Sequence, residues 1–543
     1  MINVSLTKYN WFEYKNEHFQ VWNVGYVFFE NVFYSNKELS EFFVSNFEKV
    51  DFKELLNKLS GNFAIIIKTN SKLLIISDVV RSYPLIYTVK NQTVQVYDCD
   101  IAYKKENEDF EIDLQNLKQY VCSGLVFGNK TIYKQVFGIQ AAESVLINLN
   151  TFKISTERYY LFLYKKNDNK EYKIDINEIA EKFDKILINI FERIIQSAPN
   201  VNNWIIPLSG GHDSRLIAYY FHKLGIKNII CYSYGRVGSV QGKISKKIAE
   251  NLGYKWEFIE IDNALVKRII EGNFIEKQVD YSFIGSSTVE IQNFLPMFGL
   301  IDKNLISKND IFVPGHALDF IAGSKIDNSL MSIDRKEDVI DVLTSRNNFW
   351  NFPSNILSNS IDEVISSFNS FGVETIESFG WQERQSKYIV NAVRAYDFFD
   401  FDWRLPFWDK EIVDFFSNIP AKYQIKRHLF YEIEKLVYDE EIKSIPFDEN
   451  YKYNIIERLK QLTNYFLRNF ANIFGLTIPY LLDEGYNRLF SKDERKVKIF
   501  NKYFLKIGMK NEFKVYKNTK LSRLHVNQVI RLKIVEKLLK NLI

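Results

Sequence analysis

The sequence predicts an α/β protein built on a parallel sheet, preceded by a β-rich α+β domain and followed by a helical extension. Three observations support this. Short runs rich in β-branched and aromatic residues fill the first 165 residues. From residue 174, apolar strands alternate with amphipathic helices, as in a parallel sheet covered on both faces. Beyond residue 440 the chain is basic and aromatic. We therefore expect domains at 1–165, 174–440 and 441–543.

In the first domain, strands are expected where β-forming residues are separated by Asn, Ser and Lys turns. These runs are Phe63–Lys68, Lys72–Ser77 and Thr93–Tyr97. The polar stretch Lys165–Glu171 is typical of a linker.

In the second domain, the apolar spacing predicts alternating elements. In chain order they are a helix at Ile179–Ile195, a strand at Trp204–Leu208, a helix at Arg215–Leu224, a strand at Asn228–Ser233, a helix at Gln241–Leu252 and strands at Trp256–Ile261 and Asp310–Pro314. From about Ile361 helices dominate.

Charge is unevenly distributed along the chain. Hydrophobic residues make up 46% and charged residues 25%, which is ordinary for a globular protein, and the net charge is +4. Residues 484–543 hold 16 Lys and Arg and 5 Asp and Glu, a net of +11, so the remainder carries −7. This tail could contact phosphates, anionic lipid or acidic protein, or it could be a solvated helical face.

Cysteine content and apolar segments indicate the compartment. Cys99, Cys122 and Cys231 form no CxxC pair, so a disulfide framework or zinc site is not expected and a reducing compartment fits. The N-terminal residues do not follow the secretory pattern of a basic region and then an apolar one. The longest apolar-looking stretch, Phe470–Leu482, is shorter than the about 20 residues of a membrane span. We expect a cytoplasmic protein.

The segment Ser209–Ser214, Ser-Gly-Gly-His-Asp-Ser, carries the clearest chemical signal. It follows a predicted strand and opens a predicted helix. Gly210 and Gly211 let backbone N–H groups approach a ligand, and the helix N-terminus directs a positive partial charge at the same point. Such a turn suits a multiply charged phosphate group. Asp213 would repel phosphate unless a cation such as Mg²⁺ lay between them.

Two other interpretations of this segment compete with a phosphate site. The Walker sequence G-x-x-x-x-G-K-[ST] is absent, so this is not that phosphate loop. A glycine turn followed by an ordinary Asp or Ser helix cap would need no ligand. The preceding strand, the following helix and the strand–helix alternation favour the phosphate site.

Four segments together resemble the asparagine synthetase family of class B. Ser209–Ser214 resembles the S-G-G-x-D-S loop of PP-loop ATP pyrophosphatases, which have the adenine nucleotide α-hydrolase-like fold. Val313–Gly323 is similar to the family's S-G-E-G-x-D-E-x-x-G-G segment, and Asp402–Phe416 to its E-x-R-x-P-F-L-D segment. Ile419–Leu429 resembles the segment that carries the family's catalytic lysine.

Weaker similarities lie in the first domain. Leu59–Ile67, Asp78–Tyr87 and Gly124–Tyr133 are similar to segments of the family's Ntn-hydrolase-like glutaminase domain. That domain uses an N-terminal cysteine as its nucleophile, whereas position 2 here is Ile2. We expect no glutamine hydrolysis and a structural role, such as a lid or a docking surface.

The resemblance implies the site residues. ATP phosphates would lie on Ser209, Gly210, Gly211 and Ser214, with Mg²⁺ on Asp213 and Asp319. Gly315 belongs to the second loop. The adenine would pack near Ser233, Tyr234 and Gly235 at the end of a strand.

Two departures from the family concern catalysis. His316 occupies the position of a family glutamate that positions or deprotonates the reaction partner. His316 could act as a base near neutral pH or merely fill a turn. In Lys426-Arg427-His428-Leu429, either Lys426 or Arg427 could be the catalytic cation, unless both belong to a basic surface helix.

The function implied is an ATP-dependent ligase that adenylates a carboxylate and transfers it to ammonia or an amine. A scaffold without turnover and a tRNA-modifying PP-loop enzyme are the alternatives. Small-molecule substrates are the expected partners, with nucleic acid not expected. A homodimer and contact of the basic tail with an anionic surface are left open.

Overall fold

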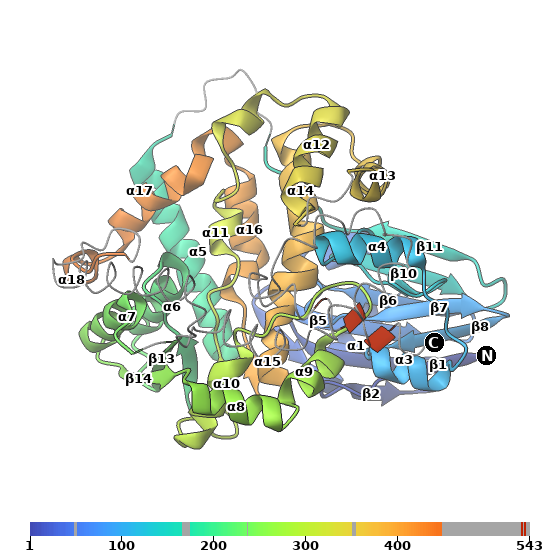
Figure 1. The fold of residues 1–543 in the computed structure, drawn as a ribbon, viewed down its shortest axis with the longest axis horizontal. Helices are drawn as coiled ribbons and strands as arrows, with labels where there is room; N and C mark the ends of the chain where they lie inside the picture. Colours follow the sequence, from blue (N-terminus) through green and yellow to red (C-terminus); the bar gives the residue numbers. More distant parts are fainter. Residues whose placement is uncertain are drawn as a thin grey trace, which may run out of the picture.

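The computed structural model describes residues 1–47, 51–165, 174–235, 237–349 and 354–447, together with Arg531, Ile534, Val535, Lys537 and Leu538. The described chain is a mixed α/β protein with an antiparallel β-rich N-terminal region and a five-stranded parallel sheet (Figure 1). The expected linker after Lys165 and most of the expected helical C-terminal extension lie outside the described residues.

Two sheets form the N-terminal region. The larger sheet has the order β11 (Ile154–Arg158), β10 (Glu143–Asn148), β6 (Lys72–Ser77), β5 (Ser60–Lys68), β3 (Gln20–Phe29) and β2 (Phe12–Lys15), with β4 (Val32–Ser35) paired to β3. The smaller sheet has the order β1 (Ile2–Ser5), β8 (Thr93–Tyr97), β7 (Ile86–Lys90) and β9 (Phe137–Gly138). β1 runs parallel to β8, and the other described pairs of both sheets are antiparallel.

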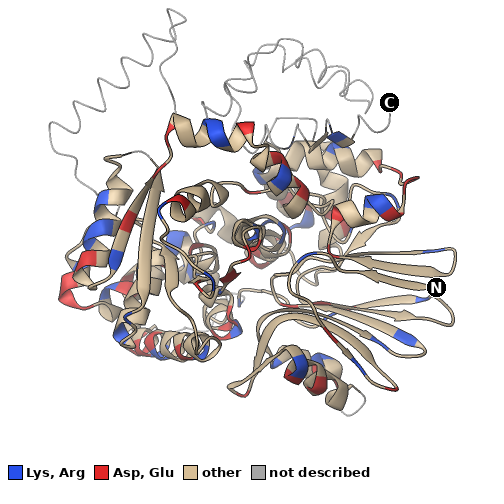
Figure 2. Ribbon diagram, turned by 90° about the horizontal axis from the view of Figure 1, so that it is seen from below, with Lys and Arg blue, Asp and Glu red and all other residues tan. Residues whose placement is uncertain are grey.

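Alternation along β5 explains why these sheets stack (Figure 2). Ile66 faces an apolar core shared with Leu73, Val94 and Val96, which lies between the two sheets. Ile65 and Ile67 point to the other face and join the main core. Helix α1 (Asn36–Asn46) packs on β3, and α3 (Asp100–Glu106) packs on β8. The expected strands in this region are confirmed.

Five strands form the parallel sheet, in the order β14 (Lys255–Glu260), β13 (Ile229–Gly235), β12 (Trp204–Pro207), β15 (Ile311–Phe312) and β16 (Asp402–Trp403). All four neighbouring pairs are parallel. The chain starts in the centre, moves outward to β14, and returns to the other side of β12. β12 and β15 therefore flank a topological switch point, where open α/β sheets bind ligands beyond the carboxyl ends of the strands.

Helices surround this sheet, and the expected ones are confirmed. They include α5 (Ile176–Gln196), α6 (His212–Lys223), α7 (Val240–Asn251), α8 (Asn263–Glu271), α9 (Phe274–Ser282), α10 (Phe294–Asp302) and the short α11 (Leu318–Ile321). α6 begins at His212, three residues before the helix expected at Arg215. β15 is shorter than the strand expected at Asp310–Pro314.

The rest of the described chain is mainly helical, and helices dominate from about Ile361, as expected. It comprises η1 (Asn328–Ser332), α12 (Lys336–Asn347), α13 (Asn355–Ile365), α14 (Val373–Phe379), the π-helical η2 (Gly380–Ile389), η3 (Val390–Val393), α15 (Arg394–Asp397), η4 (Pro406–Trp408), α16 (Lys410–Ser417), η5 (Ala421–Tyr423), η6 (Ile425–Arg427), α17 (His428–Val437) and α18 (Glu440–Lys443). α4 (Leu114–Ser123) belongs to the N-terminal region.

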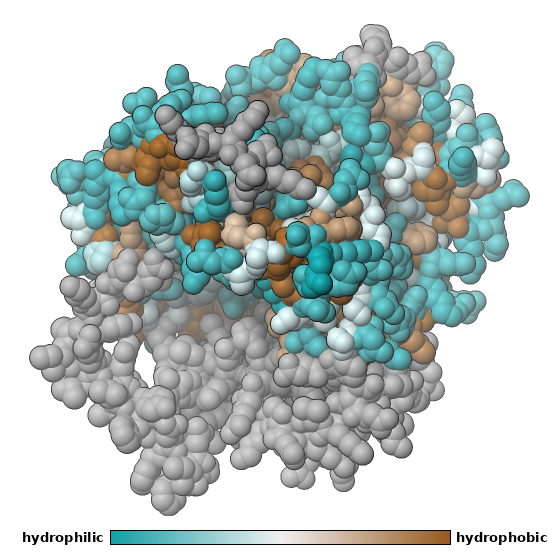
Figure 3. All heavy atoms as spheres, turned by 90° about the horizontal axis from the view of Figure 1, so that it is seen from above, coloured by the Kyte–Doolittle hydropathy of each residue, from teal (hydrophilic) through white to brown (hydrophobic). Residues whose placement is uncertain are grey.

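No helix among the described residues is long and apolar enough to cross a membrane. On the face seen from above, apolar side chains form separate patches among polar ones (Figure 3).

A buried ion pair joins the two regions at η2. The Lys387 ammonium donates to the carbonyls of Val126 and Gly128 at 2.8 and 2.6 Å, and to Glu383 at 2.6 Å. Gly128 N donates to the other Glu383 oxygen at 3.0 Å. Both side chains are buried, so each charge depends on its partner.

Breaking this pair should destabilise the whole chain. In Lys387→Met the Glu383 carboxylate stays buried without its cation, which costs about 3–5 kcal/mol. Chemical denaturation should show this loss. The double variant Glu383→Gln, Lys387→Met should recover much of it, because no buried charge remains; a double variant as unstable as the single one would contradict this account.

Candidate active site

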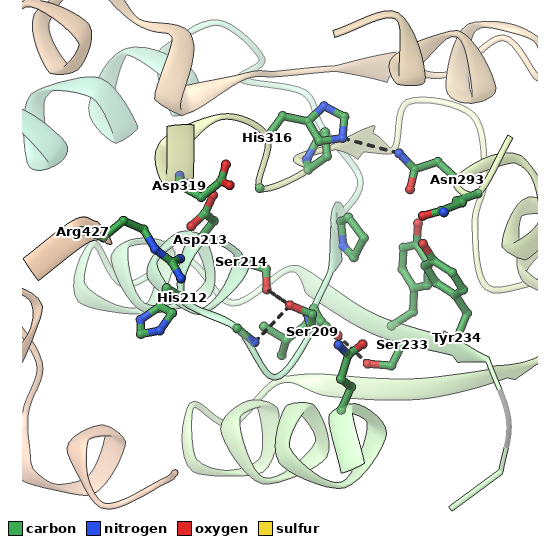
Figure 4. Close-up of a pocket in the computed structure, with 18 residues that line it drawn as sticks. Ser209, His212, Asp213, Ser214, Ser233, Tyr234, Asn293, His316, Asp319 and Arg427 are labelled. Carbon is green, nitrogen blue, oxygen red and sulfur yellow. Dashed lines mark hydrogen bonds between the residues drawn. The ribbon is translucent and has the colours of Figure 1, made fainter. Parts of the chain in front are cut away.

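A cavity of about 560 Å³ lies at the switch point of the parallel sheet (Figure 4). Most of its lining comes from the ends of β12, β13 and β15 and from the loops that follow, with further residues from α7, the segment before α10 and η6. The described lining residues are Pro207, Leu208, Ser209, Gly211, His212, Asp213, Ser214, Tyr232, Ser233, Tyr234, Gln241, Gln292, Asn293, Pro314, Gly315, His316, Asp319 and Arg427.

Most of the predicted site residues are therefore brought together. Ten of them line the cavity: Ser209, Gly211, Asp213, Ser214, Ser233, Tyr234, Gly315, His316, Asp319 and Arg427. Gly210, Gly235 and Lys426 are not among its described lining residues, although each is a chain neighbour of one that is.

The two serines shape the glycine turn after β12. Ser209 N donates to the Ser214 hydroxyl at 3.0 Å, the two hydroxyl oxygens lie 3.1 Å apart, and Gly211 N donates to Ser209 Oγ at 3.1 Å. Among the described residues, no side chain caps the N-terminus of α6. The first amides of this helix therefore suit an anionic ligand.

Close approach of a second loop completes the site. A Cβ on Gly315 would lie 2.9 Å from Ser214 N and 3.1 Å from Asp213 Cβ, so this position requires a residue without a side chain. The approach carries Asp319 to Asp213: Asp319 N donates to Asp213 Oδ2 at 3.1 Å. Ala317, between Gly315 and Asp319 in the chain, has a φ of 87°. This conformation costs energy and persists where the surroundings enforce it.

The two carboxylates repel each other. Burial, followed by the charge of Asp319, raises the pKa of Asp213 well above its usual range, while Arg427 opposes this. No cluster of three or more His, Cys, Asp or Glu that could hold a metal occurs among the described residues. A pair of carboxylates beside an amide-lined turn nevertheless fits Mg²⁺, which usually takes one or two carboxylates plus phosphate oxygens.

The geometry distinguishes Lys426 from Arg427. Both residues have positive φ, 50° and 65°, in a turn held by Lys426 N donating to Ile326 O at 3.0 Å. Arg427 lines the cavity and lies close enough to Asp213 to lower its pKa. Figure 4 shows Arg427 beside Asp213 and Asp319. Arg427 is therefore the better candidate for the catalytic cation.

His212, the variable residue of the glycine loop, has a structural role that the sequence did not indicate. Its Nδ1 lies 2.5 Å from Glu434 Oε2 on α17, and its ring stacks on Phe447 with centroids 3.8 Å apart. Tyr438 donates to the other Glu434 oxygen at 2.8 Å. This anchor joins the loop to a helix more than two hundred residues away in sequence.

His316 lies on the opposite wall, with Nε2 3.4 Å from Asn293 Nδ2. Burial lowers the pKa of His316 to about 4. The ring is thus neutral at neutral pH and is poorly matched to general-base catalysis there. A neutral imidazole still donates or accepts a hydrogen bond. The assignment of His316 as a catalytic residue stays a prediction.

Several lining residues were not predicted. Gln241, Gln292 and Asn293 carry amide side chains but belong to no motif. Behind them, the buried Glu290 accepts from Gln292 N at 2.5 Å, and burial raises the pKa of Glu290 to about 7. Ser233 lines the cavity, but its hydroxyl also bonds to Leu208 O and lies 2.6 Å from Ser245 Oγ.

No protein-family model and no curated protein matches the sequence. Parts of the chain are similar to solved structures. An NH3-dependent NAD synthetase from Campylobacter jejuni is 14% identical, with a TM-score of 0.18, over 36% of this chain and 79% of that one. An NMN synthetase from Francisella tularensis is 12% identical, with a TM-score of 0.20, over 38% and 93%. A glutamine PRPP amidotransferase from B. subtilis is 13% identical, with a TM-score of 0.19, over 48% and 53%.

At these TM-scores the similarities carry no argument about the site. The strand order, the switch point and the two loops described above define the candidate site.

The buried His316 should make stability depend on pH. The unfolded chain binds a proton at this residue near its ordinary pKa of 6.5, whereas the native state resists protonation down to about 4. Stability from this group is therefore full above about pH 6.5 and is lost as the pH falls towards 4. Between pH 7.5 and 5, the free energy of unfolding measured in urea should fall by on the order of 2 kcal/mol less in His316→Gln than in the wild type. Equal losses would contradict the pKa of His316.

Removing the charge of Asp213 should stabilise the protein. Because the native pKa is raised, stability is lost as the pH rises from the ordinary Asp range through that pKa. Asp213→Asn should thus raise the melting temperature at pH 7, which thermal denaturation would measure. Asp327→Asn is the matched control, since the pKa of Asp327 is lowered and its removal should not stabilise.

Proposed function

We propose that this chain is an ATP-dependent carbon–nitrogen ligase that adenylates a carboxylate and transfers the acyl group to ammonia or an amine. The observation that carries the proposal is the facing pair Asp213 and Asp319 at the switch point, directly beside the glycine turn. Like charges held together in this way call for a cation, and a cation beside the N-terminus of a helix suits a polyphosphate.

The residues that line the cavity would have different roles according to their position. The turn Ser209–Ser214 and the N-terminus of α6 would bind the β- and γ-phosphates, and Tyr232–Tyr234 would lie along the adenosine. Asp213 and Asp319 would hold Mg²⁺, which when bound neutralises charge on the phosphate oxygens. Arg427 lies on the same side of the cavity, where negative charge accumulates as pyrophosphate leaves.

The proposed reaction has two steps, adenylation of the carboxylate and transfer of the acyl group. A carboxylate oxygen of the substrate forms a bond to the α-phosphorus of ATP while the bond to the pyrophosphate oxygen breaks. A nitrogen nucleophile then attacks the activated acyl carbon, AMP leaves, and the nitrogen gives up a proton. The wall formed by Asn293 and His316 lies on the side away from Arg427 and would receive the acid or the amine (Figure 4).

We infer that the N-terminal region is an Ntn-type domain without glutaminase activity. Its two sheets with α1 packed on one and α3 on the other support the fold. Ile2 lies in β1 beside Val94, and the amino group of Met1 donates to Gln92 O at 2.8 Å. All three cysteines are buried. A purified protein that releases glutamate from glutamine would contradict this inference.

The direct test measures AMP and ATP–pyrophosphate exchange against a panel of carboxylic acids, with ammonium or amines as nitrogen donors. Exchange that depends on one class of acid supports the ligase. Nucleotide binding without any acid-dependent exchange would instead favour a scaffold.

The loss of activity on removing a single charge should depend on where that charge lies relative to the cavity. Asp319→Asn should lower AMP formation by at least about 100-fold, because the metal site loses one of its two carboxylates. Arg427→Gln should lower kcat by about 100- to 1,000-fold. Lys426→Gln is the matched control: it removes a cation from the same turn, with the same sign of φ, but outside the cavity lining. Equal losses in both variants would mean that the turn, not the Arg427 charge, is needed.

A further inference from the structure

The described residues near the C-terminus present one buried face to the rest of the protein. Arg531, Ile534, Val535 and Leu538 are each at most 4% exposed. Their spacing of three, four and seven residues is that of one side of a helix, and all four are helical. Lys537 forms an ion pair with Asp280 on α9. This segment therefore docks against the folded protein although it lies in the most basic part of the sequence.

Arg531 docks at the end of α4. Its Nη1 donates to the carbonyls of Val121 and Cys122 at 3.0 and 3.4 Å, and its Nε donates to Thr288 Oγ1 at 3.3 Å. The last carbonyls of a helix lack partners within it and carry a negative partial charge, so a guanidinium suits this place. A buried cation without such bonds would be costly.

Gly124 makes room for this guanidinium. It ends α4 with a φ of 80°, and a Cβ there would lie 2.2 Å from Arg531 Nη2 and 2.7 Å from its Cζ. Any other residue at this position would displace the guanidinium. The fit between Gly124 and Arg531 is therefore a specific contact between segments about four hundred residues apart.

The contact reaches the active-site wall through Thr288. Thr288 N donates to Gly124 O at 2.7 Å, and its hydroxyl donates to the same oxygen at 3.1 Å. Two residues later, the buried Glu290 holds the amides of Gln292 and Asn293. Both of these residues line the cavity. Asn293 lies on the side away from Arg427 (Figure 4).

We propose that Arg531 is a positioning residue. It holds segment 288–293, whose residues Gln292 and Asn293 line the cavity, and thereby sets the binding of the acid or amine substrate, not of ATP. The choice of substrate rests on the proposed ligase function, because that wall faces the second substrate. The contact itself does not. Phosphate binding is governed by the loops after β12 and β15, which Arg531 does not contact in the described interactions.

Hydrogen exchange of full-length protein tests the contact without reference to activity. Arg531→Ala and Gly124→Ala should each speed exchange of backbone amides in residues 284–293, because either change removes the guanidinium from its seat. The double variant should exchange no faster than either single one, since both break the same contact. Gly128→Ala is the matched control: its φ is 68°, and the nearest atom to an added Cβ is Val364 Cγ2 at 3.4 Å.

Kinetics tests the consequence for the second substrate. Arg531→Ala should raise KM for the acid or amine by about 10- to 100-fold, as expected for a displaced wall, with KM for ATP nearly unchanged. Arg531→Lys should fall between it and the wild type, because an ammonium reaches fewer acceptors than a guanidinium.

The outcomes separate this proposal from the proposed function. Unchanged exchange in 284–293 in both single variants, or equal acceleration in Gly128→Ala, would overturn the role of Arg531. A rise in KM for ATP equal to that for the second substrate would also overturn it. If the wild type shows no acid-dependent pyrophosphate exchange, the ligase proposal fails, while the hydrogen-exchange result still decides whether Arg531 holds the wall.

Discussion

The candidate site depends on one enforced repulsion. Two carboxylates, Asp213 and Asp319, belong to loops that follow different strands, and they would separate if the backbone allowed it. The close approach of Gly315 to the first turn of α6 prevents this, because the second loop has no side chain to hold it away. The strain at Ala317 and in the Lys426–Arg427 turn flanks the pair. The energy of folding elsewhere thus maintains an arrangement that is unfavourable in itself.

Much of the parallel-sheet region could be predicted from the sequence, because its signals are local. Strands rich in β-branched residues and helices with apolar faces allowed elements to be predicted within a few residues of those observed, and the glycine turn with its aspartate marked one end of the cavity. The positions of Gly315 and Asp319 in the cavity lining could be predicted from the resemblance of a second segment to a family motif.

What the sequence could not supply are contacts between distant segments. The bond between His212 and Glu434 links residues with no shared motif. The choice between Lys426 and Arg427 depended on which of two adjacent side chains a left-handed turn directs into the cavity. Gln292 and Asn293 reach the site only because the segment before α10 folds against the N-terminal region. The imidazole of His316 has its proton affinity lowered by surroundings that come from several segments.

The seam between the two regions bears on how such a protein can change over evolutionary time. Lys387 reaches out of the helical region and takes two of its acceptors from carbonyls of the first region, while Glu383 takes an amide from there. A descendant that discarded the first 165 residues would expose this ammonium–carboxylate pair and the aromatic surface around Trp381, whose indole donates to Val79 O. The N-terminal region therefore covers buried charged and aromatic side chains of the helical region, and its loss would destabilise the rest of the protein.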